Sequence, residues 1–498
     1  MTQLRIPEST FAALRRRHLD PAAPFERLSY MFGKSFTDHL GATHVLVSSP
    51  PLQLSDDCFV RQAGAQVMLY DDVRDALWVQ FARSDDDVFI DIHDHWFSPG
   101  GTRFSSVDDR DDLARAHYMF GPFAAMLRNE PGIGADRPLR TISIVLDQTS
   151  LDAREIDIEG GFHPIERIDL VGAMPRRIIP NSARPPRGFD VDRMLRQQDF
   201  IAAERQQFIA GTTFGIVGCG GLGSVIAEAL FRIGARDFIL FDEDALATHN
   251  LNRWQGARPG DIDRNKARLL ADRLRRFGRV GEVSALAVPL SVVDRAAQPM
   301  LQGCDILIGC VDNDVARYVV NRAAVQYLIP YFDAGVNIRT REGVDFESRV
   351  FAVIPGVSAC AECTAYDLLD FGGIEAAMTD PVTAAEMVRA GYVSDRPELL
   401  AAASAYPLNL RAASTLVTEL TNWICGYRPW ATCVFENWRD GLHQRSDRGN
   451  HPERPSPGCS VCTTLFGAAD QIPLPRPRPS AESEQALLQA AESLHAAM

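Results

Sequence analysis

A glycine-rich segment follows a short apolar run near the middle of the chain. Its candidate phosphate-binding residues are Gly218, Gly220, Gly221, Gly223 and Ser224. Glycines allow a tight turn and close backbone approach, so that phosphate oxygens can reach the N–H groups at the positive end of a following helix. Asp242 ends the next apolar run, 19 residues after Gly223, where a carboxylate can bind ribose hydroxyls. The pattern predicts a nucleotide site for NAD or ATP; a glycine turn without a ligand is the alternative.

Two histidines and a carboxylate form a second pattern of side chains that could bind a metal. His93 and His95 follow an apolar run, and Ser105 and Asp108 come shortly after them. Two imidazoles and one carboxylate give zinc three ligands and leave the fourth position open for water, as a hydrolytic site requires. Ser105 adds a hydroxyl group close to these ligands, and the role of an oxyanion-stabilising group is implied for it by the resemblance described below. A polar loop with two incidental histidines is the alternative interpretation.

Four of the ten cysteines fall into two C-x-x-C pairs, Cys360 with Cys363 and Cys459 with Cys462, with 95 residues between the pairs. Four thiolates complete a tetrahedral zinc site and leave no position for a substrate. We therefore expect this zinc to stabilise the fold and not to catalyse. Unrelated surface or core cysteines are the alternative.

The elements that must position these residues fall into two different patterns. Residues 40–95 contain four apolar runs, at 43–49, 65–70, 76–81 and 87–93, which we interpret as strands, and segments 9–18 and 110–127 are predicted helices. A proline- and arginine-rich stretch at 176–190 is typical of a linker. This predicts a first α/β domain over residues 1–175.

From residue 191 onward strands alternate with helices. Strands are predicted at 213–218, 237–242 and 305–310, and helices at 224–234 and 265–277. This alternation indicates βαβ units and a parallel sheet, so the second domain, 191–472, is predicted to be a Rossmann-like α/β domain. Residues 473–498 form a proline-rich spacer and one predicted helix.

The residues that follow Asp242 separate ATP from NAD. Asp244, the run Asn252-Arg253-Trp-Gln255, Asn265-Lys266 and Cys310-Val-Asp312-Asn313 resemble the motifs of the ThiF-type, ubiquitin-activating-enzyme-like adenylating family, over about residues 191–466. The resemblance implies that Arg253 and Lys266 are the cations on the triphosphate of ATP and that Asp312 holds Mg²⁺. Attack of a carboxylate on the α-phosphate brings anions together, so fixed cations and a metal are needed there.

The same resemblance implies a partner subunit and a carrier protein. Arg193-Met-Leu-Arg196-Gln197 resembles the R-x-x-R-Q segment of the family, in which an arginine reaches the nucleotide of the partner subunit; Arg196 is the candidate, and a homodimer is implied. The family also has a structural zinc at the place of the C-x-x-C pairs. No cysteine stands between Cys363 and Cys425, so adenylation is better supported than thioester formation, and the acyl-adenylate would pass to an outside thiol or sulfur donor.

The histidine pattern resembles the H-x-H…S-x-x-D motif of the JAMM metalloproteases, which cut ubiquitin-like proteins from their targets. The resemblance makes Glu26 the general base that takes the proton of the zinc-bound water. Two features depart from the family: Trp96 stands where a proline often follows H-x-H, and the spacing to Ser105 is slightly long. A catalytically inactive scaffold of this fold is a further alternative.

Composition limits the partners. A net charge of −14 and a pI near 5.3 argue against nucleic acid and anionic membranes. The sequence has no signal-peptide pattern and no apolar run of membrane-spanning length, so a cytoplasmic location is expected.

Four functions stay open at this point. The first is a bifunctional enzyme that trims or removes a ubiquitin-like protein and activates it, together with a conjugating enzyme. The second is activation of a sulfur carrier in cofactor or amino-acid biosynthesis, which needs a sulfur donor. The third is a non-catalytic nucleotide-binding scaffold, and the fourth is a nicotinamide-dependent oxidoreductase.

Overall fold

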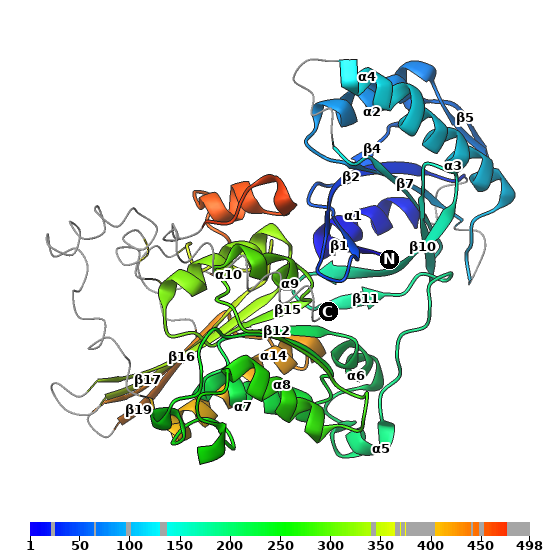
Figure 1. The fold of residues 1–498 in the computed structure, drawn as a ribbon. Coiled ribbons are helices and arrows are strands. Elements are labelled where there is room, and N and C mark those ends of the chain that lie inside the picture. The colour runs from blue at the N-terminus through cyan, green and yellow to red at the C-terminus, as the bar shows by residue number, and fades with distance from the viewer. Residues whose placement is uncertain are drawn as a thin grey trace, which may run out of the picture. The chain divides into compact units, whose positions relative to one another are not determined.

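The computed structural model describes residues 1–20, 25–63, 66–95, 101–129, 137–339, 345–363, 369, 374, 404–439, 442–447 and 453–475. Trp96 and the predicted helix within 473–498 lie outside the described residues. The chain folds into two compact units, Met1–Pro186 with Gly467–Gln471, and Arg187–Phe466 with Ile472–Met498 (Figure 1). Within the described residues no helix is both long and apolar enough to cross a bilayer.

A nine-stranded sheet forms the centre of the first unit. Its strands are β1 (Thr2–Pro7), β2 (Leu28–Thr37), β3 (Thr43–Leu46), β4 (Leu52–Gln53), β7 (Val88–Asp94), β8 (Arg140–Leu146), β9 (Leu151–Ile156), β10 (Phe162–Val171) and β11 (Arg176–Ile178). They pair in the order β1-β3-β2-β7-β8-β9-β10-β11, and β4 pairs with β2. Because β1 also pairs in parallel with β10, the sheet closes on itself. Strand β11 lies within the segment that the sequence predicts as a linker.

Helices cover the two faces of this sheet. They are α1 (Glu8–His18), α2 (Asp71–Arg83), α3 (Ser106–Tyr118) and α4 (Ala124–Asn129); short turns at Asp56–Cys58 and Met119–Phe123 and a small hairpin, β5 (Phe59–Ala63) with β6 (Gln66–Leu69), complete the unit. Side chains alternate along β7, as the twofold period of a strand requires. Ile90 and Ile92 pack in one cluster with the α1 side chains, whereas Phe89 packs in another with α2.

The prediction of a strand at 76–81 is wrong, because these residues lie within α2. Leu77, Trp78, Phe81 and Ala82 are buried, while Val79 is exposed, which is the period of a helix with one apolar face. Aspartates in its first turn and an arginine in its last turn favour the same helix. The predictions at 43–49, 65–70 and 87–93 are confirmed by β3, β6 and β7.

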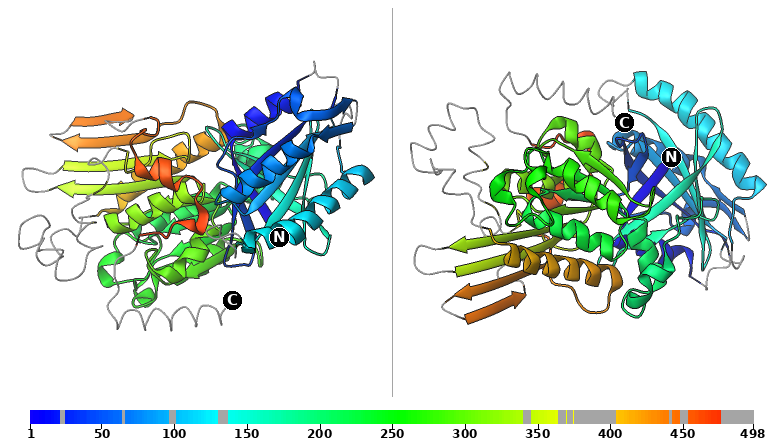
Figure 2. Two further views of the ribbon diagram at one scale, coloured as in Figure 1. Left: turned by 90° about the horizontal axis from the view of Figure 1, so that it is seen from above. Right: turned by 60° about the horizontal axis from the view of Figure 1, so that its bottom comes forward.

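The second unit contains an eight-stranded sheet. Its strands are β12 (Thr213–Val217), β13 (Asp237–Phe241), β14 (Ser284–Val288), β15 (Ile306–Gly309), β16 (Tyr331–Arg339), β17 (Asp345–Val353), β18 (Cys433–Arg439) and β19 (Leu442–Asp447). The order is β14-β13-β12-β15-β16-β17-β18-β19. Strands from β14 to β16 are parallel and those from β16 to β19 are antiparallel. In Figure 2 the antiparallel strands reach beyond the helices of this unit.

Helices lie on both faces of this sheet. They are α5 (Val191–Met194), α6 (Ala203–Ala210), α7 (Gly221–Arg232), α8 (Lys266–Phe277), α9 (Gln298–Gln302), α10 (Asp314–Gln326) and α14 (Tyr406–Cys425), with short helical turns at Leu195–Gln197, Thr248–Asn250, Pro259–Asp261, Arg295–Ala297 and Val461–Leu465. Figure 1 shows α9 and α10 on the opposite face from α7, α8 and α14. The chain runs from β12 to β13 and β14 on one side and then returns to β15 on the other. The carboxyl ends of β12 and β15 therefore border a topological switch point, where such folds bind ligands.

Candidate nucleotide and metal sites

The glycine segment forms the turn between β12 and α7. Gly218 has φ +91°, and a Cβ atom there would lie 2.7 Å from the carbonyl oxygen of Cys310. A Cβ at Gly223 would lie 2.0 Å from the Gly218 carbonyl oxygen, whereas at Gly220 it would meet nothing within 4 Å. Gly218 and Gly223 thus allow the turn to pack against β15, and the backbone at Gly220 stays open at the start of α7. This cradle fits a phosphate group.

The carboxylate of Asp242 lies beside this turn, at the end of β13. It accepts hydrogen bonds from the backbone N–H of Cys219 at 2.7 Å and of Asp244 at 3.0 Å. Burial raises the pKa of Asp242, and the charge of Lys266 opposes that rise. The two backbone bonds fix the carboxylate next to the glycine turn, and its remaining lone pairs are suited to accept from ribose hydroxyls.

Two cations are held near the turn by local contacts. The Lys266 ammonium, at the start of α8, lies 2.7 Å from a carboxylate oxygen of Asp244. Arg253 donates to the carbonyl oxygen of His249 at 2.8 Å, and its side-chain Cγ would be 3.1 Å from a Cβ on Gly221. The side chains of Arg253 and Lys266 are therefore placed around the cradle by short segments that follow β13.

Other residues of the predicted nucleotide site have structural partners. The buried Ser224 hydroxyl accepts from the backbone N–H of Gln255 at 3.1 Å, and Gln255 in turn contacts Glu228 and Tyr406. Asn252 contacts Arg253 at 3.5 Å. These bonds join the helix α7 to the segment that carries Arg253.

Asp312 stands in the loop that follows β15. It is exposed, and Cys310, two residues earlier, lies where a Cβ atom added at Gly218 or Gly223 would meet it. Asn313 caps α10, because its side-chain oxygen accepts from the backbone N–H of Ala316 at 2.8 Å. The predicted magnesium residue thus follows the strand next to the glycine turn, at the same edge of the sheet.

Arg196 lies apart from these contacts. It is exposed in the turn Leu195–Gln197, and within the described part of the chain no hydrogen bond or ion pair joins it to the glycine turn. Arg193, by contrast, pairs with Glu282 at 2.6 Å and lies over the ring of Phe231. Among the described residues, Arg193 has side-chain partners, whereas no hydrogen bond or ion pair holds the exposed Arg196.

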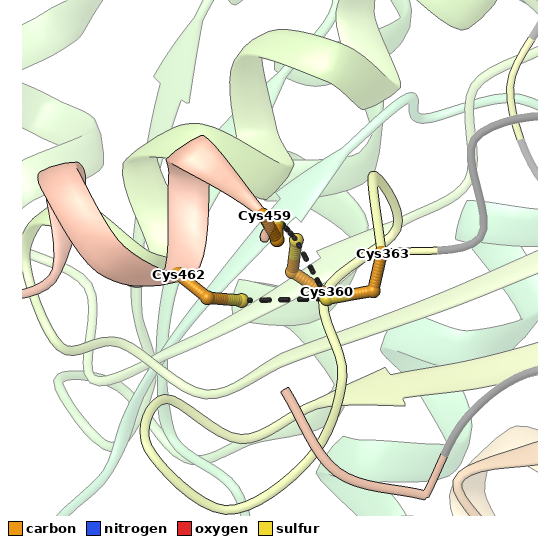
Figure 3. Close-up of side chains that lie close together, drawn as sticks. All are labelled: Cys360, Cys363, Cys459 and Cys462. Atoms are coloured by element: carbon orange, nitrogen blue, oxygen red, sulfur yellow. Dashed lines mark hydrogen bonds between the residues drawn. The ribbon is translucent and has the colours of Figure 1, made fainter. Parts of the chain in front are cut away.

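The four paired cysteines converge (Figure 3). The sulfur of Cys360 lies 3.6 Å from that of Cys459 and 3.8 Å from that of Cys363, which is 3.5 Å from the sulfur of Cys462. Zinc–sulfur bonds of about 2.3 Å in a tetrahedron place sulfurs about 3.8 Å apart, whereas a disulfide needs about 2.05 Å. The four thiols are free and their spacing fits a zinc ion.

A second group of ligands lies at the end of β7. One ligand atom from each of His93, His95 and Asp108 falls within 4.8 Å of the others. Asp108 lies 3.3 Å from Nε2 of His93 and 3.8 Å from Nε2 of His95. Apart from this ion-pair contact, the buried Nε2 atom of His93 has no hydrogen-bond partner among the described residues, which suits a nitrogen that faces a metal position. The donor set fits zinc with an open position.

Glu26 lies beside these ligands. Its carboxylate oxygen is 3.8 Å from Nε2 of His95, and its side chain is largely buried. Burial raises the pKa of Glu26 to about 7, with help from the charges of Asp108 and Asp94, while His93 opposes the rise. A carboxylate with this pKa is suited to take up and release a proton near neutral pH.

Ser105 has a role that the sequence analysis missed. Its hydroxyl oxygen accepts from the backbone N–H groups of Val107 and Asp108, and Asp108 accepts from the N–H of Ser105 at 2.5 Å, so the pair forms a capping box at the start of α3. The S-x-x-D spacing ahead of a helix is itself the signal for such a cap. The capping box fixes the Asp108 side chain, while the hydroxyl proton of Ser105 is not used in these bonds.

Asp94 stands between the two histidines, and the sequence patterns assign it no role. It is fully buried on the α1 side of β7, where it pairs with His18 at 2.8 Å and accepts from the N–H of Arg27 at 3.2 Å. His18 also contacts the hydroxyl of Ser29 at 2.8 Å. These contacts tie the backbone next to Glu26 to β7, which carries His93 and is followed directly by His95.

The amino-acid sequence is similar to that of a known protein family and of characterised proteins. The profile of the ThiF family matches residues 191–461. The chain is 31% identical over 156 residues to the adenylyltransferase and sulfurtransferase MOCS3 of Mus musculus, which covers 30% of this chain and 34% of that protein. It is 31% identical over 201 residues to the ubiquitin-like modifier-activating enzyme 5 of Bombyx mori, covering 39% of this chain and 50% of that protein. The chain therefore spans half or less of the length of these two relatives.

Solved structures are similar at lower identity. Escherichia coli MccB, in a crystal structure with ATP, is 20% identical and covers 52% of this chain and 69% of that chain, with a TM-score of 0.40. PaaA is 18% identical and covers 52% of this chain and 73% of that chain, with a TM-score of 0.38.

Proposed function

The chain belongs to the ThiF family, and on that premise we propose that its second unit adenylates the C-terminal carboxylate of a ubiquitin-like or sulfur-carrier protein with ATP. One observation carries the proposal. The glycine turn, Asp242, the two cations and Asp312 all follow the carboxyl ends of the neighbouring strands β12, β13 and β15. A nicotinamide site would not need a lysine, an arginine and an aspartate around the same cradle.

The proposed reaction balances without a further reactant. A carboxylate oxygen of the carrier attacks the α-phosphorus of ATP, the bond to the β-phosphate oxygen breaks, and pyrophosphate leaves with the electron pair. Arg253 and Lys266 stabilise the negative charge that gathers on the phosphates. Asp312 would hold Mg²⁺, which would add positive charge at the same phosphates. Glycine backbone N–H groups bind the phosphate oxygens and Asp242 binds the ribose.

The test is pyrophosphate exchange. Purified protein is incubated with ATP, labelled pyrophosphate and candidate carrier proteins that end in glycine. Label should enter ATP only in the presence of the right carrier, and a carrier without its terminal glycine serves as the control. If none of the candidate carriers, ubiquitin-like or sulfur-carrier, supports exchange, the result would favour a nucleotide-binding scaffold. Because a conjugating enzyme or a sulfur donor would take the product, the same assay with each added separates these two fates.

We also propose that the second unit works as a homodimer in which Arg196 reaches the nucleotide of the partner subunit. Besides the exposed arginine, large apolar side chains are exposed on the same segment and on a loop next to it: Val191, Leu195, Phe200 and Tyr427. The rings of Phe200 and Tyr427 lie 4.7 Å apart, so these two side chains form one exposed apolar surface. Exposed apolar groups on a segment that also carries an exposed cation are suited to a protein interface.

A second candidate function rests on the first unit. We propose that His93, His95 and Asp108 hold a zinc ion and that this unit cleaves a ubiquitin-like protein from a precursor or a target. The bound zinc would supply Lewis acidity and lower the pKa of water. Glu26 would accept the proton of the attacking water and return it to the leaving amine, for which its raised pKa is suited. The test is cleavage of a carrier fused at its terminal glycine, with and without a chelator.

A further inference from the structure

Helix α10 contacts the loop of Asp312 at one end and the cysteine cluster at the other. We propose that α10 positions the Asp312 carboxylate from the cysteine cluster, with Arg317 and Asn321 as positioning residues. This inference rests on the proposed function, in which Asp312 is the magnesium residue. It assigns to the cluster a second role besides stability, which is to set the geometry of the adenylation site.

Arg317 holds the Asp312 loop from both sides. One guanidinium nitrogen donates to the carbonyl oxygen of Val311, and another pairs with the carboxylate of Asp314 at 2.8 Å. Val311 and Asp314 lie on either side of Asp312 in the chain. Because a guanidinium presents its N–H groups in a fixed planar fork, both contacts are made at once.

Arg317 is itself held in one place. Its side chain is largely buried, and its Nε atom lies 3.2 Å from a carboxylate oxygen of Asp333, which is fully buried on β16. The hydroxyl of Tyr331 donates to the other oxygen of Asp333 at 2.7 Å. A buried ion pair that loses one partner leaves an uncompensated charge, so the guanidinium has little freedom to move.

The next turn of α10 holds the first cysteine pair. Asn321 is fully buried, and its side-chain oxygen accepts from the backbone N–H of Ala361 at 2.8 Å. Arg322 forms a two-point ion pair with Glu362, at 3.0 and 2.9 Å. Ala361 and Glu362 are the two residues between Cys360 and Cys363. The hydrogen bond and the ion pair therefore hold α10 against the turn that carries two of the four sulfurs.

The two sets of contacts lie close together along α10. Arg317 and Asn321 are four residues apart, about one helical turn, so they are separated by only about 6 Å along the helix axis. A displacement of the cysteine turn is therefore transmitted to Arg317 and to the loop on both sides of Asp312. Neither positioning residue belongs to the nucleotide-binding set, and in this proposal their effect acts through Asp312.

The experiment uses the zinc-loaded full chain with Arg317→Lys. Lysine keeps a positive charge beside Asp333 but lacks the fork that reaches Val311 and Asp314 together. The readout is the Mg²⁺ concentration that half-saturates binding of a fluorescent ATP analogue, measured with zinc content and melting temperature. We expect this concentration to rise by about 10-fold or more, as for residues that orient metal ligands, with zinc retained. Arg439→Lys, whose arginine pairs with the partly exposed Asp345 at 2.9 Å, is the matched control and should not shift it.

A second single variant and a double variant test the same link between α10 and Asp312. Asn321→Ala removes the contact to Ala361 and should raise the Mg²⁺ requirement in the same direction. In an Asp312→Ala background, Arg317→Lys should cause no further change, because the two residues act through one carboxylate. An unchanged Mg²⁺ requirement in both single variants, or an equal shift in the Asp312→Ala background, would overturn the inference. Wild-type protein that binds the analogue independently of Mg²⁺ would instead overturn the proposed role of Asp312 itself.

Discussion

The Nε2 atom of His93, on β7, lies 3.3 Å from the Oδ1 atom of Asp108, on α3. Burial lowers the pKa of His93, but Asp108, with help from the charges of Asp91 and Glu26, outweighs burial, and the net pKa is raised. Burial raises the pKa of Asp108, but the hydrogen bond and charge of His93 lower it more, so the net pKa of Asp108 is lowered. In the metal-free protein the two side chains form an ion pair.

This pair gives a pH-dependent stability of the metal-free protein. A raised histidine pKa adds stability that is complete below the unfolded value of about 6.5 and is lost as the pH rises through the folded pKa. A lowered aspartate pKa adds stability that is complete above about 3.9 and is lost as the pH falls through the folded pKa. Melting temperatures of chelator-treated protein should show this contribution between these values, and His93→Gln should remove it. A profile that His93→Gln leaves unchanged would contradict the ion pair.

Zinc uptake at the same site should release protons. His93 must lose its proton to bind a metal, so zinc affinity should increase as the pH rises through its folded pKa. Competition with a zinc-binding dye at several pH values, on protein whose four cysteines already hold zinc, measures this. His95→Ala should weaken uptake at every pH, and an affinity that does not depend on pH would argue against His93 as a ligand.

Loss of the cysteine cluster should lower both metal content and stability. We expect one tightly held zinc per cluster, and Cys360→Ser with Cys459→Ser should remove it and reduce the melting temperature, because structural zinc contributes folding free energy. Elemental analysis and thermal unfolding test this. Cys58→Ser, which changes a cysteine outside the cluster, is the control. Zinc content equal to that of the wild type would refute the site.

Lys266→Ala should abolish adenylation and spare cleavage. The change withdraws a cation from the triphosphate, and we expect pyrophosphate exchange to fall by roughly 10²–10³-fold. Arg268→Ala, an exposed residue two positions later on α8, is the control and should keep full activity. Exchange at the wild-type rate in Lys266→Ala would show that this ammonium does not act on the phosphates.

Glu26→Ala should have the opposite selectivity. The change removes the proposed base, so cleavage of a carrier fusion should fall by roughly 10²–10⁴-fold. Adenylation of a carrier that already ends in glycine should be unchanged. If Glu26→Ala also silences adenylation, the first unit is better regarded as a recognition domain for the carrier.

A mixing experiment tests Arg196. If this residue acts across a homodimer, Arg196→Ala and Asp312→Ala proteins should each be inactive in exchange, and a mixture should regain activity, because a mixed dimer contains one site with both residues intact. Random exchange of subunits places at most about a quarter of all sites in that state. A mixture as inactive as its components would argue for a role within one chain.

The sequence by itself determined the local units. The glycine turn and Asp242 could be assigned because one βαβ unit contains them, and the period of apolar residues together with the short loops of such a unit fixes where its strands end. The C-x-x-C pairs were equally visible, since each is a single turn. The same reasoning failed at 76–81, where three buried side chains follow a helical period within a run that is also apolar enough for a strand.

Only the tertiary structure decided which distant residues meet. Glu26 reaches His95 because β2 pairs with β7, and Asp108 reaches both histidines because the capping box at Ser105 fixes the start of α3. Arg317 meets Asp333 only through packing of α10 against β16, and Cys360 meets Cys459 across 99 residues. These contacts depend on strand pairing and helix packing, which are set by the burial of the whole apolar surface and leave no local pattern in the residues that they bring together.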